Sequence, residues 1–147
     1  SSDIFHDHIA IHSASTRPNS PDSSTVLGHL RHVLLADGEV HTVKVKYFPY
    51  VETKYINSFT ANEVLLPYLK DNGEGRRLGT LAVFIDEGIR ENKPIIAIPL
   101  NLSVLLDLPQ SLAYTGFTSS TGDKWEKHEI LSWKWCEGSH CPGEDGD

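Results

Sequence analysis

The sequence predicts an all-β protein, built as a sandwich or barrel of short strands. Three segments place β-branched, aromatic or leucine residues at every second position, the period of a strand, at residues 41–47, 80–86 and 128–135, with Ile130 as an exception in the last. Helical spacing is confined to a short stretch at residues 62–69, which contains a proline, and to a second at 102–108. Several short strands separated by turn residues are typical of a sandwich or barrel.

Each of the three long strands is expected to present one apolar face to the interior. The residues on these faces are Val43, Val45 and Tyr47, then Leu81, Val83 and Ile85, and finally Leu131, Trp133 and Trp135. Shorter strands are expected at residues 9–11, 33–35, 95–98 and 112–117. Asp37 and Gly38 lie between two of the strands and are typical of a hairpin turn. We expect Trp133 to lie in the core and Trp125 to be the more exposed tryptophan.

Two segments interrupt the strand pattern. Residues 13–25 are rich in Ser, Thr, Pro and Asn, so we expect an exposed loop there. Residues 48–77 contain large apolar side chains, among them Tyr55, Phe59 and Leu65, and are too apolar for a free linker. Structureless loops longer than about 12–15 residues are uncommon. We therefore expect this insertion to pack on the sandwich or on a partner.

The composition excludes two classes of protein. The chain has 147 residues, enough for one domain, and a formal net charge of −7. This charge argues against nucleic-acid binding, which needs clustered Lys and Arg. No apolar run approaches the ~20 residues of a membrane span. Because the chain contains no Met, we expect a processed product or a part of a longer polypeptide.

The last twelve residues form an acidic tail, residues 136–147, with four acids and no Lys or Arg. Its two cysteines, Cys136 and Cys141, are the only ones in the chain and favour a short-loop disulfide in an oxidising compartment. A zinc site with His140 as a third ligand is the alternative. The only Asn-x-Ser/Thr sequon lies at Asn101 and predicts N-glycosylation in a secreted protein.

Three stretches of the chain resemble a known family. Residues 114–133 contain Tyr-Thr-Gly-Phe, then Thr-Ser-Ser-Thr-Gly, then His-Glu-Ile-Leu-Ser-Trp, which resembles the C-terminal signature of L-type (legume-like) lectins. Residues 37–43, Asp-Gly-Glu-Val-His-Thr-Val, are similar to the family's Asp-Gly-x-x-His-x-Val strand. Asp3, four further residues and then His8-Ile-Ala-Ile resemble a segment of its metal loop. The resemblance covers about residues 3–135.

The resemblance implies a concanavalin-like jelly roll of two antiparallel sheets that binds carbohydrate without catalysis. The lectin-like domain would span residues 1–135, with the insertion at 48–77 and the tail at 136–147 after it. The family's N-terminal half has no counterpart in this sequence, so we expect the sandwich to be incomplete in this chain. A partner chain or a cleaved N-terminal portion would complete it. We expect the protein outside the cell or in the lumen of the secretory pathway.

The resemblance also implies a binding site. The residues that match the family's sugar-contacting loop are Thr121, Gly122, Asp123 and Lys124. Asp3 and His8 match metal ligands, for calcium or, as in legume lectins, manganese. Carboxylate oxygens suit calcium, and a His beside a carboxylate suits a softer transition ion.

An enzyme is not predicted. A glycoside hydrolase needs two carboxylates facing each other across a cleft, whereas the acids within the predicted strands, Asp86 and Glu129, are isolated. The alternative function is a structural or assembly module of an extracellular complex, which keeps the lectin scaffold and uses residues 48–77 as a protein interface.

Overall fold

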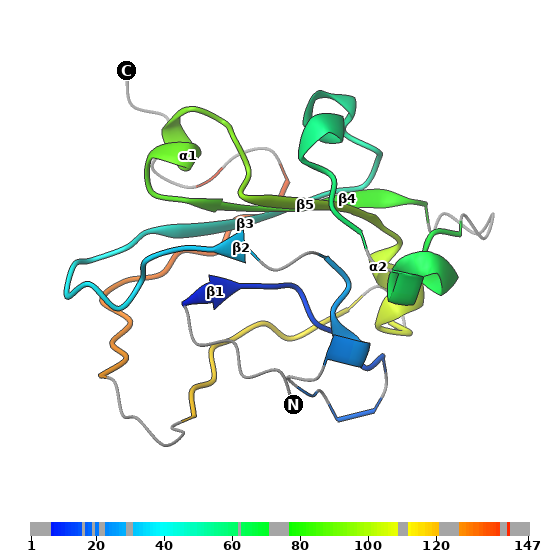
Figure 1. Cartoon of the computed structure of the whole chain (residues 1–147). Coiled ribbons are helices and arrows are strands. Elements are labelled where there is room, and N and C mark those ends of the chain that lie inside the picture. The colour runs from blue at the N-terminus through cyan, green and yellow to red at the C-terminus, as the bar shows by residue number, and fades with distance from the viewer. Residues whose placement is uncertain are drawn as a thin grey trace. The chain divides into compact units, whose positions relative to one another are not determined.

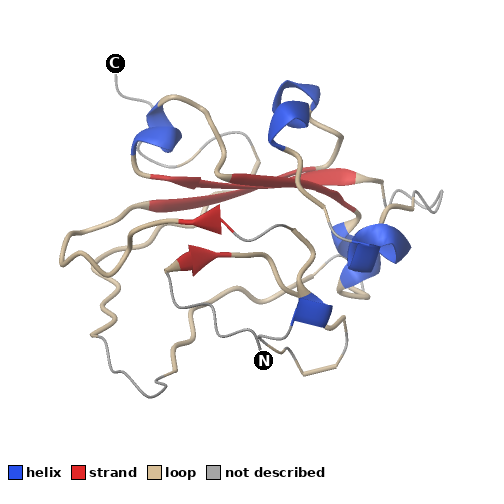
Figure 2. Cartoon of the chain, viewed as in Figure 1, coloured by secondary structure: helices blue, strands red, loops and turns tan. Residues whose placement is uncertain are grey.

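Two small antiparallel sheets organise the part of the chain that the structure describes (Figures 1 and 2). The computed structural model describes residues 7–15, 17–18, 20, 23–28, 31–61, 63–70, 77–108, 112–120, 127–138 and 141. The chain divides into two units, Ser1–Tyr114 and Thr115–Asp147, and both sheets belong to the first.

The larger sheet has three strands in the order β3 (Val43–Phe48), β4 (Gly79–Ile85) and β5 (Ile96–Leu100), all antiparallel. The short helix α1 (Glu87–Arg90) links β4 to β5. These strands confirm the predictions at residues 41–47, 80–86 and 95–98. The residue pattern predicted these strands correctly because each segment is hydrogen-bonded to a neighbouring strand along most of its length.

The smaller sheet pairs β1 (His8–Ile9) with β2 (Arg31–His32). The strand expected at residues 33–35 is wrong, because β2 ends before it. The hairpin expected at Asp37 and Gly38 is also wrong, because β2 pairs with β1 whereas β3 pairs with β4. Gly38 does turn the chain, with a φ of +79° that favours glycine.

The core covers both faces of the larger sheet. Successive side chains of a strand point to opposite faces. One cluster comprises Leu27, Leu65, Ile96, Ile98, Leu100 and Leu105, with Ile9 and Ile11 packed against it. The other comprises Phe48, Tyr55, Ala82, Phe84 and Ala97, with Ile89 of α1 packed against it. The segment that contains β1 therefore covers one face, and α1 covers the other (Figure 1).

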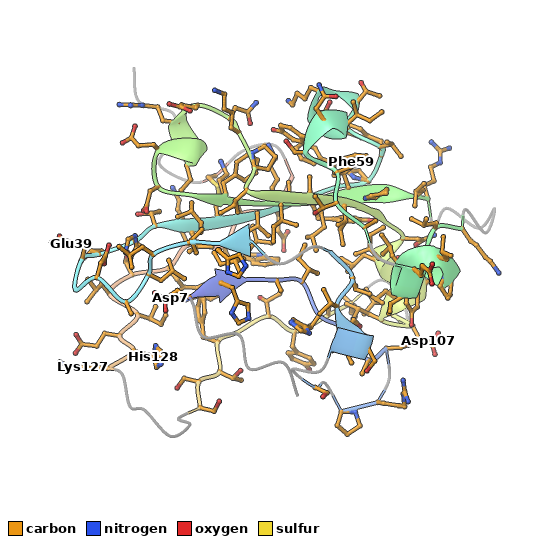
Figure 3. All side chains as sticks on the ribbon, viewed as in Figure 1. Asp7, Glu39, Phe59, Asp107, Lys127 and His128 are labelled. Atoms are coloured by element: carbon orange, nitrogen blue, oxygen red, sulfur yellow. A yellow bond between two sulfur atoms is a disulfide. The ribbon has the colours of Figure 1, made fainter. Side chains whose placement is uncertain are left out.

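The insertion at residues 48–77 packs on the chain's own sheet. It contains two 3-10 helices, η2 (Thr53–Ser58) and η3 (Glu63–Tyr68), which bring Tyr55 to one core cluster and Leu65 to the other. Between them lies Phe59, which is labelled in Figure 3. It forms an isolated parallel β-bridge with Ala97 of β5. We expected this segment to pack either on the sandwich or on a partner. Its described residues pack on the sheet of the chain itself.

Residues 13–25 contain more structure than the exposed loop that we expected. The 3-10 helix η1 (Ser23–Thr25) ends on Thr25, which is buried. The Thr25 hydroxyl donates to the carbonyl of Ser20 at 2.6 Å and lies 2.9 Å from His12 Nδ1. Ala14 is buried as well. These contacts fold the described part of the segment back against His12.

The second unit contains no helix or strand among its described residues, 115–120, 127–138 and 141. The strand expected at residues 128–135 is therefore wrong, and so is the one expected at 112–117. Trp133 is 55% exposed rather than in the core. Its ring lies 5.4 Å from that of Phe117 and 6.5 Å from that of Trp135, between ring centres. Alternation supplied an apolar face, but a strand also needs a hydrogen-bonded neighbour.

The disulfide between Cys136 and Cys141 is present, with the two Cα atoms 4.8 Å apart. This confirms the expected pairing. It also rules out the zinc alternative in the oxidised chain, because the sulfur atoms of a disulfide provide no thiolate ligand.

Candidate functional site

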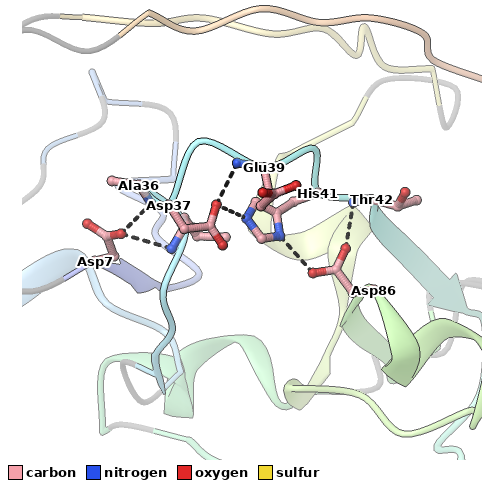
Figure 4. A network of polar contacts seen from close by, with 8 residues as sticks. Asp7, Ala36, Asp37, Glu39, His41, Thr42 and Asp86 are labelled. Atoms are coloured by element: carbon pink, nitrogen blue, oxygen red, sulfur yellow. Dashed lines mark hydrogen bonds and ion pairs between the residues drawn. The ribbon is translucent and has the colours of Figure 1, made fainter.

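A network of polar contacts joins the turn before β3 to the end of β4 (Figure 4). The imidazole of His41 lies between two carboxylates: Nδ1 is 2.8 Å from Asp86 Oδ2, and Nε2 is 2.9 Å from Asp37 Oδ1. Asp86 also accepts a bond from the backbone N–H of Thr42, and Asp37 accepts one from that of Glu39. The arrangement follows from the register, because Val43 pairs with Ile85 and so places His41 beside Asp86.

The charges in this network support each other. Hydrogen bonds to Asp86 and Asp37 raise the pKa of His41 above its ordinary value of 6.5. The His41 ring and the Thr42 N–H lower the pKa of Asp86, while the Glu39 N–H and the His41 ring lower that of Asp37. Hydrogen bonds occupy both ring nitrogens, so the network holds the turn before β3 against the end of β4.

Asp7 fastens the same turn from the other side. Its Oδ2 accepts bonds from the backbone N–H groups of Leu35, at 2.8 Å, and Ala36, at 2.6 Å. These two donors lower the pKa of Asp7. The start of β1 is thereby tied to the segment that leads into the His41 network (Figure 4).

The residues that the resemblance assigned to the binding site are mostly outside the described part of the chain. This is so for Asp3 and for all of Thr121, Gly122, Asp123 and Lys124. His8 is described: it is exposed on β1, opposite His32 of β2. Within the described ranges, no group of three or more His, Cys, Asp or Glu side chains is arranged to hold a metal ion. The described residues by themselves thus do not provide the family's metal site.

The asparagine of the sequon has a structural role. Asn101 is completely buried as the N-cap of the helix α2 (Leu102–Leu105). Its Oδ1 accepts a bond from Val104 N, and its Nδ2 donates to the Lys70 carbonyl at 2.6 Å. A glycan would replace the second hydrogen of Nδ2, and it would need space that a completely buried side chain lacks. The folded arrangement therefore does not fit glycosylation at Asn101.

Sequence reasoning missed two groups of residues. It treated Asp86 as an isolated acid, although the register brings Asp86 to His41. It also gave no role to His32, which lies opposite His8. For the His41 network, part of the signal was present in the sequence: in the Asp-Gly-x-x-His pattern at residues 37–41, His41 follows Asp37 closely enough for one turn to bring the two side chains together.

The described residues contain no helix long and apolar enough to cross a membrane.

The family model of the legume lectin domain matches residues 1–144 of the chain. No significant match was found among curated proteins or among solved structures.

Legume lectin domains are jelly-roll β-sandwiches that generally bind carbohydrate without catalysis, and they typically bind calcium and manganese. The antiparallel sheets and few short helices of this chain agree with an incomplete sandwich of this kind. Because the match covers nearly the whole sequence, the chain belongs to the legume lectin family.

Proposed function

We propose that this chain contributes to a carbohydrate-binding site and does not catalyse a reaction. The observation that carries the proposal is the legume lectin match over residues 1–144, which includes both stretches that resemble the family's site. The residues assigned to sugar contact are Thr121, Gly122, Asp123 and Lys124. Asp3 and His8 are assigned to calcium or manganese.

The geometry of the described carboxylates supports binding rather than hydrolysis. Glycoside hydrolysis needs one carboxylic acid that donates a proton and a second carboxylate on the other side of the sugar. Asp37 and Asp86 instead share the imidazole of His41 between them. Their lowered pKa values keep both groups ionised, so neither is suited to donate a proton near neutral pH.

The disulfide supports a location outside the cell or in the secretory lumen, since disulfides persist in oxidising compartments. The larger sheet supports the proposal that a partner chain completes the sandwich. Its edge strand β3 leaves Val43 and Val45 exposed by 54% and 63%, on the face that carries Val83. Exposed edges and apolar faces favour pairing with further strands. We propose that strands of a partner chain cover this edge.

The alternative of an assembly module relied on the apolar side chains of residues 48–77. Tyr55 and Leu65 are buried in the chain's own core and do not provide an interface, whereas Tyr50, Ile56 and Leu66 of the same segment are exposed. Carbohydrate binding is the better-supported function because the family match covers residues 1–144.

The test is a glycan array probed with the native assembly that contains this chain, with calcium and manganese present or chelated. Asp123→Ala and Lys124→Ala should each abolish or strongly weaken binding to those sugars on the array that the unchanged protein binds. The matched controls are Glu137→Ala and Lys134→Ala, which remove the same charges at exposed positions. If all four variants bind alike, or if the unchanged protein binds no glycan, the proposal is wrong.

A further inference from the structure

Two lysines on one face of the larger sheet approach the same aromatic ring. Lys46 and Phe48 lie two residues apart on β3, so their side chains stand on one face. The Lys46 ammonium lies 4.7 Å from the centre of the Phe48 ring, and the Lys54 ammonium of η2 lies 5.8 Å from the same centre. Lys54 also lies 5.2 Å from the centre of the Tyr55 ring. The two positive charges are therefore gathered around rings that are themselves buried.

The charge at this place is positive, although the whole chain has a net charge of −7. Lys54 forms an ion pair with Glu52 at 3.6 Å, which is longer than the ~2.7–2.9 Å of a hydrogen bond between charged groups. Among the described residues, Lys46 has no ion-pair partner. One carboxylate thus accompanies two ammonium groups. Because each ammonium has three donors, both lysines keep donors for an anion.

An exposed aromatic ring lies beside the lysines. Tyr50 is 52% exposed, and the centre of its ring lies 5.6 Å from that of Phe48. The hydroxyl of Thr80, which is completely buried, donates to the Tyr50 carbonyl at 2.9 Å and accepts from the Glu52 N–H at 2.8 Å. The turn between β3 and η2 is thus fixed on β4 before any ligand binds, which lowers the entropic cost of binding.

We propose that Lys46, Lys54 and Tyr50 bind an anionic saccharide, with a sulfate or carboxylate group at the two ammonium groups and a sugar ring against Tyr50. A sugar ring has apolar C–H groups between its hydroxyls, and an exposed tyrosine presents an apolar ring with a polar end to such a ligand. The inference takes the saccharide from the proposed function and rests on that function in this respect only. It adds a second binding surface, on β3, η2 and the turn between them, and it specifies the charge of the ligand.

The test is calorimetry of the 147-residue chain with three oligosaccharides that share one backbone: dextran, dextran sulfate and carboxymethyl dextran. At least one charged oligomer should bind more tightly than dextran, and added NaCl should weaken this binding because salt screens exposed charges. Lys46→Gln and Lys54→Gln should each weaken it about three- to fivefold, the upper range for an exposed ion pair, and the double variant about tenfold or more. Lys70→Gln, at an exposed position after η3, is the matched control and should bind as the unchanged chain does.

Further variants separate the parts of the site. Glu52→Gln removes the competing charge and keeps the side-chain oxygen that accepts from the Lys54 N–H, so it should bind the charged oligomer more tightly. Tyr50→Ala should weaken binding of the oligomer but not of inorganic sulfate, because sulfate has no ring to cover the aromatic side chain. Lys46→Arg and Lys54→Arg keep the charge and should retain binding, which distinguishes a loss of charge from a failure to fold.

Three results would overturn the inference. The first is that neither charged oligomer binds more tightly than dextran, and the second is that this binding survives in the double lysine variant. The third is equally tight binding of inorganic sulfate, or tighter binding to phosphatidylserine vesicles, because the site would then serve a simple anion or a membrane surface. A chain that binds dextran sulfate through the two lysines but binds no neutral glycan on the array would contradict only the proposed function, and the converse only this inference.

Discussion

Replacement of Leu65 by Ala tests whether the insertion is a structural part of the domain. Leu65 lies in η3, is completely buried, and packs with Ile96 and Ile98 of β5. The change removes three carbons, each worth about 0.8 kcal/mol of transfer free energy, or roughly 2.4 kcal/mol together. The cavity left behind adds to this loss, so we expect a destabilisation of about 3–4 kcal/mol, within the ~2–5 kcal/mol measured for buried leucines.

The neighbouring residue provides a matched control. Leu66 lies in the same 3-10 helix but is 61% exposed, and its replacement by Ala should change the stability by no more than about 0.5 kcal/mol. The assay is urea denaturation of the 147-residue chain, with the free energy of unfolding compared for the three proteins. Equal stabilities of the two variants would refute the reasoning, because they would mean that Leu65 does not contribute to the core.

Two further predictions concern charge and the disulfide. Because the pKa of His41 is raised in the fold, its contribution to stability should be complete below pH 6.5 and should be lost as the pH rises through the raised value. The stability advantage of the unchanged chain over His41→Gln should therefore shrink above pH 6.5. It should also shrink well below pH 3.8, because the carboxylates of Asp37 and Asp86, whose pKa values are lowered, become protonated there. Melting curves from pH 3 to 9 measure this difference, and a pH-independent difference would contradict the prediction. For Cys136 and Cys141, alkylation of the native chain should label neither thiol until a reductant is added, and reduction should change stability little because the two cysteines are only five residues apart.

The strands of the larger sheet could be predicted because their signal is local. Val43 and Val45 alternate with lysines, and β4 is a short apolar run rich in β-branched and aromatic residues, so each segment indicates a strand without knowledge of its partner. Pairing is not local. Asp37 and Gly38 have the composition of a hairpin turn, yet β3 pairs with β4, which lies more than thirty residues further along the chain. Turn chemistry alone does not decide which strand becomes the neighbour.

The insertion shows a second limit. The apolar content of residues 48–77 predicted burial, and Tyr55 and Leu65 are buried. The sequence did not show that they would reach opposite faces of one sheet. That outcome depends on two separate 3-10 helices, and on a backbone bond of 3.0 Å from Thr60 to the Ala97 carbonyl that fixes the chain between them.

The candidate sites depend on register even more strongly. Motif reasoning finds residues that are close in sequence, such as Asp3 and His8, or Asp123 and Lys124. It does not find His41 with Asp86, because one residue precedes β3 and the other follows β4. A shift of one residue in this ladder would turn one partner to the opposite face and would abolish the contact. The same shift would leave every sequence motif unchanged, so only the register decides whether these side chains act together.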